Sequence, residues 1–393
     1  MSRIQEIENI ADSLREEIET ISDFIFLHPE LGDREFVSSG YLAALLKQNG
    51  FQVQYPYCNL PTAFRAEFGN TGGPKIAFLA EYDALPGYGP QKLPAHACGH
   101  NWIAASTVGA ALILSKLQAC LPGTVVVIGT PAEETIGRKI DLVHNGAFDD
   151  IDAAFQMHLN ENTNLHASAL AMDSWRFAFF GKASHAASHP FCGINALDAV
   201  NLTFAGISAL RQQLKSDARI HGIITDGGQA ANVIPERAIC EFYVRSEKRS
   251  YLNEVSEKVK NCARGAALMT GAKLDICSFE NSYDDLQVNP VLSELMFKNL
   301  TNAGIDDFCD ERELAGSTDI GNVSHCVPTF YGNIGVGGGT ARAHEEAFLQ
   351  FVNSPEAQEK LLKVAKAFAF SACQLFAQPE LLQKAKDKFK SGY

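Results

Sequence analysis

The beginning of the chain has a regular spacing of hydrophobic residues. Isoleucine and leucine recur at steps of three and four residues, at Ile4, Ile7, Ile10, Leu14, Ile18, Ile21 and Ile25. This spacing predicts an amphipathic opening helix that buries one face. From about residue 50 the pattern alternates between short β-rich runs at 51–57, 63–68, 75–81, 124–130 and 151–158 and a helical run at 102–117. The alternation predicts an α/β domain with a largely parallel sheet covered by helices.

The pattern changes after about residue 170. It predicts a strand, a helix, two strands, a helix and a strand, at 173–181, 194–214, 219–227, 237–246, 251–270 and 272–279. The order β-α-β-β-α-β is that of a ferredoxin-like unit. We therefore expect an inserted second domain over residues 171–285. The first domain would consist of residues 1–170 and 286–393, the latter with a helix near 288–303, a strand at 329–336 and a closing helix at 355–377.

The composition favours a globular protein and argues against some classes of partner. The 393 residues exceed one ordinary core, and 46% hydrophobic with 20% charged residues is typical of a globular protein. The net charge of −13, with no basic run, argues against nucleic acid and anionic lipid as partners. The charged N-terminus resembles neither a signal peptide nor a membrane anchor. Ten cysteines without a CxxC pair fit reduced thiols, so we expect a cytoplasmic protein.

Reactive side chains follow the predicted strands of the first domain. They are Asp83 after 75–81, Cys98 and His100 in the loop before the helix, Glu133 and Glu134 after 124–130, His158 at the end of 151–158, and His344 beyond a glycine-rich loop after 329–336. Parallel strands present their carboxyl ends at one edge of a sheet, where ligands bind. Thiol, imidazole and carboxylate groups at one edge predict a metal site.

The number of donors fits two metal ions. Two tetrahedral zinc ions need eight coordination positions, which His100, Glu134, His158 and His344, a bridging Cys98 thiolate and a bridging water would fill. Cys98 and His100 cannot share a helical face at a spacing of two, so both must lie where the helix begins. There the helix dipole favours a thiolate.

Glu133 remains without a metal in this count. A carboxylate beside a ligand can accept a proton from the metal-bridging water and pass it to a leaving amine. The predicted chemistry is therefore amide hydrolysis by a metal-bridged hydroxide.

With these residues, the sequence resembles the aminoacylase and glutamate-carboxypeptidase-like family of dinuclear metallohydrolases, in its amidohydrolase branch. That branch includes indole-acetyl-amino-acid hydrolases, p-aminobenzoyl-glutamate hydrolase and beta-alanyl-lysine dipeptidase. The resemblance covers nearly the whole chain, through the motifs "LHPELGDRE", "AEYDALPG", "HACGHN", "PAEE", "GKASHAASHP", "NVIPERA", "GSTDIGNVSHCVP" and "AHEEAF". It implies a zinc-peptidase-like catalytic domain with a ferredoxin-like lid and dimerisation domain.

The resemblance also implies roles for individual residues. The metal ligands would be Cys98, His100, Glu134, His158 and His344, with Glu133 as catalytic base. Asp83 would orient a ligand. His185 would reach the neighbouring subunit's site and stabilise the oxyanion, and Asn232 would contact substrate, so a homodimer through the inserted domain is implied.

Asn101 and two arginines bear on the expected substrate. Many members of the branch have Asp after "CGH", whereas this chain has Asn101, a variant associated with the beta-alanyl-lysine and p-aminobenzoyl-glutamate subgroups. We expect a small N-acyl or N-aminoacyl amino acid or a dipeptide, with Arg245 and Arg342 as anchors for its carboxylate. Two divalent ions are expected per subunit, Zn²⁺ first and Mn²⁺ or Co²⁺ as alternatives.

Other readings account for less of the sequence. A serine hydrolase would need a GxSxG elbow, which the chain lacks. The run "GNIGVGGGT" is not followed by a helical pattern, as a dinucleotide-binding motif would be. His96 fits a supporting or structural role better than a ligand role, and His28 fits a helix cap. A non-catalytic sensor of metal or of an amino-acid conjugate remains an alternative, against which Glu133 argues.

Overall fold

The chain forms two units in the computed structural model, which describes residues 3–117, 121–309 and 316–392. The first unit comprises Met1–Ser168, Leu286–Ala315 and Asn322–Tyr393, and the second comprises Ala169–Asp285 and Gly316–Gly321. The predicted boundaries placed the short Gly316–Gly321 segment in the catalytic domain. In the structure it joins the second unit because Leu170 donates its N–H to the Gly316 carbonyl at 2.9 Å and Arg245 donates to Ser317 Oγ at 3.2 Å.

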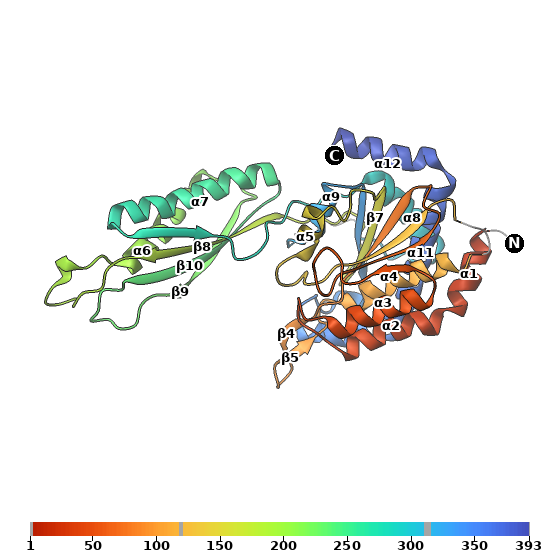
Figure 1. Cartoon of the computed structure of the whole chain (residues 1–393), viewed down its shortest axis with the longest axis horizontal. Coiled ribbons are helices and arrows are strands. Elements are labelled where there is room, and N and C mark those ends of the chain that lie inside the picture. Colours follow the sequence, from red (N-terminus) through yellow and green to blue (C-terminus); the bar gives the residue numbers. More distant parts are fainter. Residues whose placement is uncertain (1–2, 118–120, 310–315, 393) are drawn as a thin grey trace. The chain divides into compact units, whose positions relative to one another are not determined.

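The first unit is built on a six-stranded sheet with the strand order β1-β2-β6-β3-β7-β12. Figure 1 labels β7 of this sheet. β6, β3, β7 and β12 pair in parallel, whereas β1 and β2 join antiparallel. The strands span Gln52–Gln54, Phe64–Gly69, Lys75–Ala80 (β3), Thr124–Gly129 (β6), Ala153–Asn160 (β7) and Thr329–Gly335 (β12). All of β6 and β12 is buried, as in parallel strands covered on both faces. The predicted mostly parallel sheet is confirmed.

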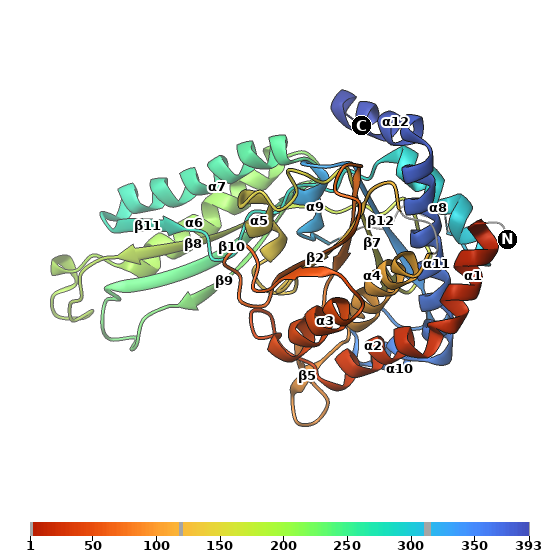
Figure 2. The same cartoon turned by 45° about the vertical axis from the view of Figure 1, so that its right-hand side comes forward.

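Helix α4, His100–Ser115, lies at the centre of the first unit and is buried through Leu114. It packs on β3, β6 and β7, while α2 and α11 pack against it (Figure 2). The helices of this unit span Arg3–Ser13 (α1), Arg15–Leu27 (α2), Phe36–Gln48 (α3), Arg138–His144 (α5), Pro290–Asn302 (α8), Leu349–Val352 (α10), Pro355–Ala377 (α11) and Pro379–Ser391 (α12). A hairpin of β4, Leu85–Tyr88, and β5, Leu93–Ala95, precedes α4, and the short α9 spans Ile320–Ser324.

The single opening helix that the sequence predicted is divided into α1 and α2. The break falls at Leu14, whose φ of −98° and ψ of 2° depart from helical values. Just before it, Ser13 Oγ donates a hydrogen bond to the Ile10 carbonyl at 2.7 Å, a local bond of the kind that bends helices. The isoleucine stripe is still buried at Ile7, Ile18, Ile21 and Ile25.

The second unit has the predicted order of elements. These are β8 (Ala171–Phe180), α6 (Ala196–Leu210), β9 (Arg219–Asp226), β10 (Arg237–Ser246), α7 (Arg249–Thr270) and β11 (Lys273–Cys277). The sheet order is β11-β8-β10-β9, and every pair is antiparallel. Helices α6 and α7 both pack on β8 and β10 (Figure 1). β9 and β11 are therefore the edge strands of this sheet.

Two further sequence-based expectations concern the described residues as a whole. Every cysteine among them is a free thiol, and Cys120 lies outside them. Of the helices in the described ranges, none combines the length and the apolar character needed to span a bilayer.

Candidate functional site

The loop between β5 and α4 brings Cys98 and His100 against the end of β7. Gly99 between them has a φ of +78°, which favours glycine. A Cβ atom at Gly99 would lie 2.9 Å from Leu159 Cβ, too close for any other residue without a shift. The glycine therefore lets the start of α4 approach β7 closely. As the sequence predicted, Cys98 lies in the loop just before the helix.

The candidate metal ligands of the first unit converge on Cys98. Its Sγ lies 3.3 Å from His158 Nε2 and 3.3 Å from His344 Nε2. Glu134 Oε1 lies 3.3 Å from His344 Nε2 and 3.7 Å from His100 Nε2. Ligand bonds of about 2.1 Å around a tetrahedral ion place neighbouring donors roughly 3.4 Å apart. The donors thus have the spacing of a metal site, in two groups that share Cys98: Cys98, His100 and His158, and Cys98, Glu134 and His344.

Asp83 connects two of these ligands. His100 donates its Nδ1–H to Asp83 Oδ1 at 2.9 Å, and the Glu134 backbone N–H donates to Asp83 Oδ2 at 2.9 Å. In the same way His158 donates its Nδ1–H to the Leu159 carbonyl at 2.7 Å. A proton on Nδ1 leaves the Nε2 lone pair of each imidazole available as a metal ligand. Both rings are therefore oriented for binding through Nε2.

The charges within this cluster call for a cation. Burial and the neighbouring Glu134 carboxylate raise the pKa of the Cys98 thiol well above its ordinary value. Burial opposes protonation of His100, but Asp83 and Cys98 raise its pKa well above the ordinary value. Protein groups alone therefore do not favour a thiolate beside neutral imidazoles. A divalent ion favours that state, because it stabilises both the thiolate and the imidazole lone pairs.

His344 is held in an unusual backbone conformation. Its φ is +72°, a value that residues other than glycine adopt rarely and at a cost. Its N–H donates to the Ala97 carbonyl at 2.9 Å, and Tyr88 Oη donates to its carbonyl at 2.7 Å. These bonds fix the C-terminal loop beside Cys98, although the His344 side chain is 55% exposed.

Glu133 lies at the same cluster. His100, Glu133 and Glu134 each offer a ligand atom, and these atoms lie within 4.8 Å of one another. Glu133 is half-buried. A carboxylate at this position can exchange protons with a molecule bound at the cluster.

The remaining predicted residues lie elsewhere. His185 and Asn232 are residues of the second unit, on adjacent segments joined by the Ala186 N–H donating to the Asn232 carbonyl at 3.0 Å. Arg245 lies on β10 of the same unit. Arg342 belongs to the first unit, with its side chain 77% exposed and its Nε 3.7 Å from Glu161. The structure thus brings the metal-ligand candidates together with Asp83 and Glu133, and places His185, Asn232 and Arg245 in the second unit.

Two charged residues at the cluster were not predicted from the sequence. Glu81 directly follows β3, and Lys139 lies on α5; the residues are 1% and 0% exposed. Lys139 Nζ donates to Glu81 Oε1 at 2.5 Å. Glu81 has the same signal as Asp83, a carboxylate after a buried strand. No sequence pattern indicates a buried role for Lys139, since a lysine among polar residues is most often solvated.

His28 and His96, which were not predicted to be metal ligands, lie in a helix cap and in a buried position. His28 ends α2, and its Nδ1–H donates to the Phe24 carbonyl at 2.7 Å, as expected of a cap. His96 is buried, and burial together with the nearby His100 lowers its pKa to about 3.

Glu35 supports the loop that carries Glu133 and Glu134. It is buried, and its two carboxyl oxygens accept hydrogen bonds from the Ala132 N–H at 2.7 Å and from Thr62 Oγ1 at 3.0 Å. Burial, with a smaller effect from the Asp83 charge, raises the pKa of Glu35 from 4.5 to about 8. At neutral pH this side chain is therefore mostly protonated.

Stability should depend on pH through Glu35. Because the folded-state pKa is raised, its contribution is complete below pH 4.5 and is lost as the pH rises to about 8. Glu35→Gln, which does not titrate, should therefore gain about 3 kcal/mol relative to the parent protein between pH 5 and pH 8. Urea unfolding of both proteins at the two pH values measures this gain. If the two proteins differed in free energy of unfolding by the same amount at pH 5 and at pH 8, Glu35 would titrate normally.

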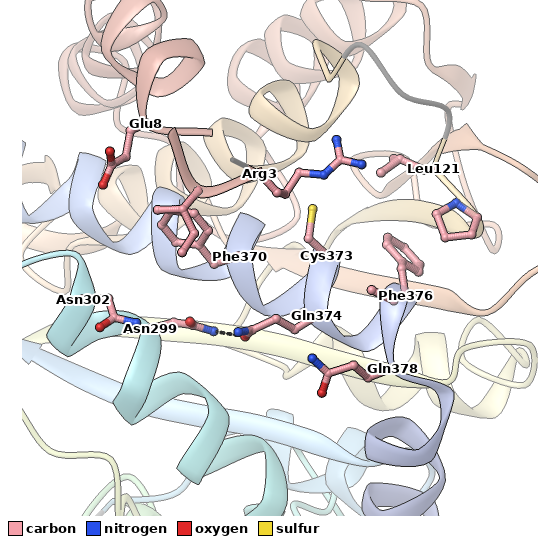
Figure 3. Close-up of a pocket in the computed structure, with 13 residues that line it drawn as sticks. Arg3, Glu8, Leu121, Asn299, Asn302, Phe370, Cys373, Gln374, Phe376 and Gln378 are labelled. Atoms are coloured by element: carbon pink, nitrogen blue, oxygen red, sulfur yellow. Dashed lines mark hydrogen bonds between the residues drawn. The ribbon is translucent and has the colours of Figure 1, made fainter. Parts of the chain in front are cut away.

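A separate apolar pocket lies between α1, α8 and α11 (Figure 3). Its volume is about 330 Å³, and its wall includes Leu121, Phe370 and Phe376. Asn299 Nδ2 donates to Gln374 Oε1 at 2.8 Å on one side of it. None of the candidate metal or catalytic residues lines this pocket.

Comparison with known proteins defines the class. Residues 77–370 match the model of peptidase family M20/M25/M40. The chain is 37% identical over 396 residues to the Xaa-Arg dipeptidase of Mus musculus, covering 96% of this chain and 90% of that protein. It is 35% identical over 333 residues to a subunit of the p-aminobenzoyl-glutamate hydrolase of Escherichia coli, covering 80% and 68%.

Solved structures share the fold. A dinuclear metal binding peptidase of the M20 family from Bacillus subtilis superposes with a TM-score of 0.71 at 23% identity, covering 93% of this chain and 99% of that one. An aminobenzoyl-glutamate utilization protein from Klebsiella pneumoniae gives 0.72 at 20% identity, covering 93% and 98%. The chain belongs to the peptidase family M20/M25/M40. Membership confirms the resemblance inferred from the motifs and the predicted class of function, a metal-dependent amidohydrolase or dipeptidase.

Proposed function

We propose that the protein hydrolyses the amide bond of N-acyl or N-aminoacyl amino acids, dipeptides included, at a site for two metal ions. The observation that carries this proposal is the group of donor atoms around Cys98 Sγ, spaced 3.3–3.7 Å apart. In the proposed site the protein ligands are Cys98, His100, Glu134, His158 and His344. The B. subtilis structure with the same fold, described as a dinuclear metal binding peptidase, supports the number of ions.

Glu133 and Asp83 have separate proposed roles in the reaction. When bound, the ions lower the pKa of water and polarise the amide carbonyl. Glu133 accepts the proton of the attacking water and then donates it to the leaving amine. Asp83 keeps the His100 ring in place through Nδ1. Zn²⁺ suits the thiolate and imidazole donors, with Mn²⁺ and Co²⁺ as alternatives.

The second unit is proposed to be a ferredoxin-like lid through which two subunits associate. Its edge strand β9 exposes Ile223 and Ile224, and an edge strand with unpaired backbone groups and apolar side chains favours pairing with another chain. His185 accepts N–H groups of Ala187 and Ser188 at Nδ1, at 3.2 and 3.4 Å. Its proton then lies on Nε2, which is available to donate to a developing oxyanion. We assign this donation to the neighbouring subunit's site.

Shared sites predict complementation between two inactive variants. His185→Ala and Glu133→Ala should each lose most activity, but a dimer with one copy of each variant contains one site with both residues intact. Mixing the two proteins after partial unfolding and reassociation should therefore recover up to roughly a quarter of the parental activity at equal amounts. Dimers shown to be mixed by mass, yet without recovered activity, would assign His185 to its own subunit's site or to no site.

The substrate class is proposed from the relatives and from two arginines. A chain similar over 96% of its length to an Xaa-Arg dipeptidase is first expected to cleave dipeptides with a C-terminal basic residue. Arg245 and Arg342 are proposed to bind the substrate carboxylate, and Asn232 to contact the substrate as well. The net charge of −13 is compatible with cationic substrates.

A substrate panel tests the proposed function. The metal-loaded protein is incubated with dipeptides ending in Arg or Lys, beta-alanyl-lysine, p-aminobenzoyl-glutamate and N-acetylcysteine, and the released amine is measured. We expect release from at least one, its loss on chelation and its return with Zn²⁺, Mn²⁺ or Co²⁺. Binding of these compounds without release would instead support the alternative of a non-catalytic sensor.

A further inference from the structure

The buried carboxylate of Glu81 has one oxygen without a hydrogen-bond partner. Oε1 accepts from Lys139 Nζ at 2.5 Å, but Oε2 makes no hydrogen bond within the described residues. His100 Nε2 likewise makes none there. These two atoms lie 3.6 Å apart, and both side chains are almost completely buried. A buried carboxylate oxygen without a partner is costly, so it indicates a group that the protein itself does not supply.

We infer that Glu81 Oε2 is a sixth protein donor to the metal site, on the side of His100. This inference rests on the proposed function. The separation of 3.6 Å from His100 Nε2 allows both atoms to bind one ion, since neighbouring donors at about 2.1 Å from a five-coordinate ion lie roughly 3.0–3.6 Å apart. It also resembles the 3.7 Å between His100 Nε2 and Glu134 Oε1. The Nε2 lone pair of His100 is free for an ion because Nδ1 is bonded to Asp83.

Lys139 explains how an additional carboxylate fits a buried site. Its ammonium group is fully buried and balances the charge of Glu81, so the pair adds an oxygen donor without adding net charge. An ammonium group offers no lone pair, so Lys139 cannot itself bind the ion. By holding Oε1, Lys139 leaves Oε2 on the side of His100.

Glu35 is a buried carboxyl group with a structural role, and its hydrogen bonds differ from those of Glu81. Both of its oxygens accept hydrogen bonds, one from Ala132 N–H and one from Thr62 Oγ1. Glu81 has a strong partner on one oxygen only, and the other lies beside a metal-ligand candidate. Glu35 therefore has no oxygen left for an ion, whereas Glu81 has one.

Zn²⁺ titration of the metal-stripped protein by calorimetry tests this assignment. Glu81→Gln keeps an oxygen for Lys139 and turns an NH₂ group, which cannot bind an ion, toward His100. We expect the parent protein to bind two ions, and Glu81→Gln to bind one of them at least about tenfold more weakly, since loss of even an outer partner costs roughly 10- to 100-fold. Glu294→Gln, a change of an exposed carboxylate on α8 that pairs with Lys298 at 2.7 Å, should bind both ions as the parent does.

The absorption spectrum of the Co²⁺-loaded proteins distinguishes whether Glu81 binds an ion directly or acts on it from a distance. Loss of an oxygen donor lowers the coordination number of one ion, so the visible bands of Glu81→Gln should become stronger and shift. Glu81→Gln/Lys139→Met, which removes both buried charges together, guards against misfolding of the single variant and should give the same result. Unchanged affinity and an unchanged cobalt spectrum in both variants would overturn the sixth donor. Failure of the parent protein to take up two ions would instead overturn the proposed function.

Discussion

Replacing Glu133 by alanine should lower kcat by about a hundred- to ten-thousand-fold, the usual contribution of a positioned general base. Glu133 offers a carboxylate oxygen within 4.8 Å of ligand atoms of His100 and Glu134, yet the proposed metal ligands do not include it. The variant should therefore retain both ions. Steady-state kinetics on the best substrate of the panel, with elemental analysis of the same sample, measures both quantities.

A control variant separates this effect from a general loss of carboxylates. Glu294 on α8 is an exposed carboxylate of the same unit, and it forms an ion pair with Lys298 at 2.7 Å. Glu294→Ala should keep parental kcat and metal content. If Glu133→Ala had the same kcat as Glu294→Ala, Glu133 would not be the base.

Replacing Cys98 by serine should remove metal from the site. Its Sγ lies 3.3 Å from both His158 Nε2 and His344 Nε2, and a bridging thiolate would contact both ions. A serine hydroxyl fills similar space but is not ionised near neutral pH. Metal affinity should fall by more than the roughly 10- to 100-fold that loss of an outer partner costs. Elemental analysis after dialysis should give fewer than two ions per chain, and activity should fall with them.

Cys240 provides the matched control. It is a buried cysteine of the second unit's core, where burial raises the pKa of its thiol to about 12. Cys240→Ser places a hydroxyl in that core and lowers stability. It should nevertheless leave the metal content at the parental value. Equal metal content in Cys98→Ser and the parent protein would exclude the bridging thiolate.

Sequence patterns predicted much of the fold because the strands and helices are strongly periodic. The strand at 237–246 and the helix at 355–377 have the predicted bounds in the structure. α3 was not predicted, since Ser38 and Ser39 are buried on its packed face and weaken the hydrophobic pattern. The break at Leu14 was not predicted either, because it depends on local backbone geometry that leaves the isoleucine spacing intact.

The cluster of donors could be predicted because a parallel sheet brings the carboxyl ends of its strands to one edge. Asp83 and Glu134 follow β3 and β6, and His158 lies near the end of the adjacent β7. The partner of Glu81 could not be predicted, since Lys139 is distant in sequence and its burial depends on how α5 packs. The raised pKa of Glu35 likewise depends on burial by loops that no sequence period describes.

An anomalous-difference map from crystals of the Zn²⁺-loaded protein tests the metal site most directly. We predict two strong peaks on either side of Cys98 Sγ, each at about 2.3 Å from it, with His100, His158, His344 and Glu134 as further ligands. No anomalous peak near Cys98, or peaks only at sites remote from His158 and His344, would contradict the dinuclear centre.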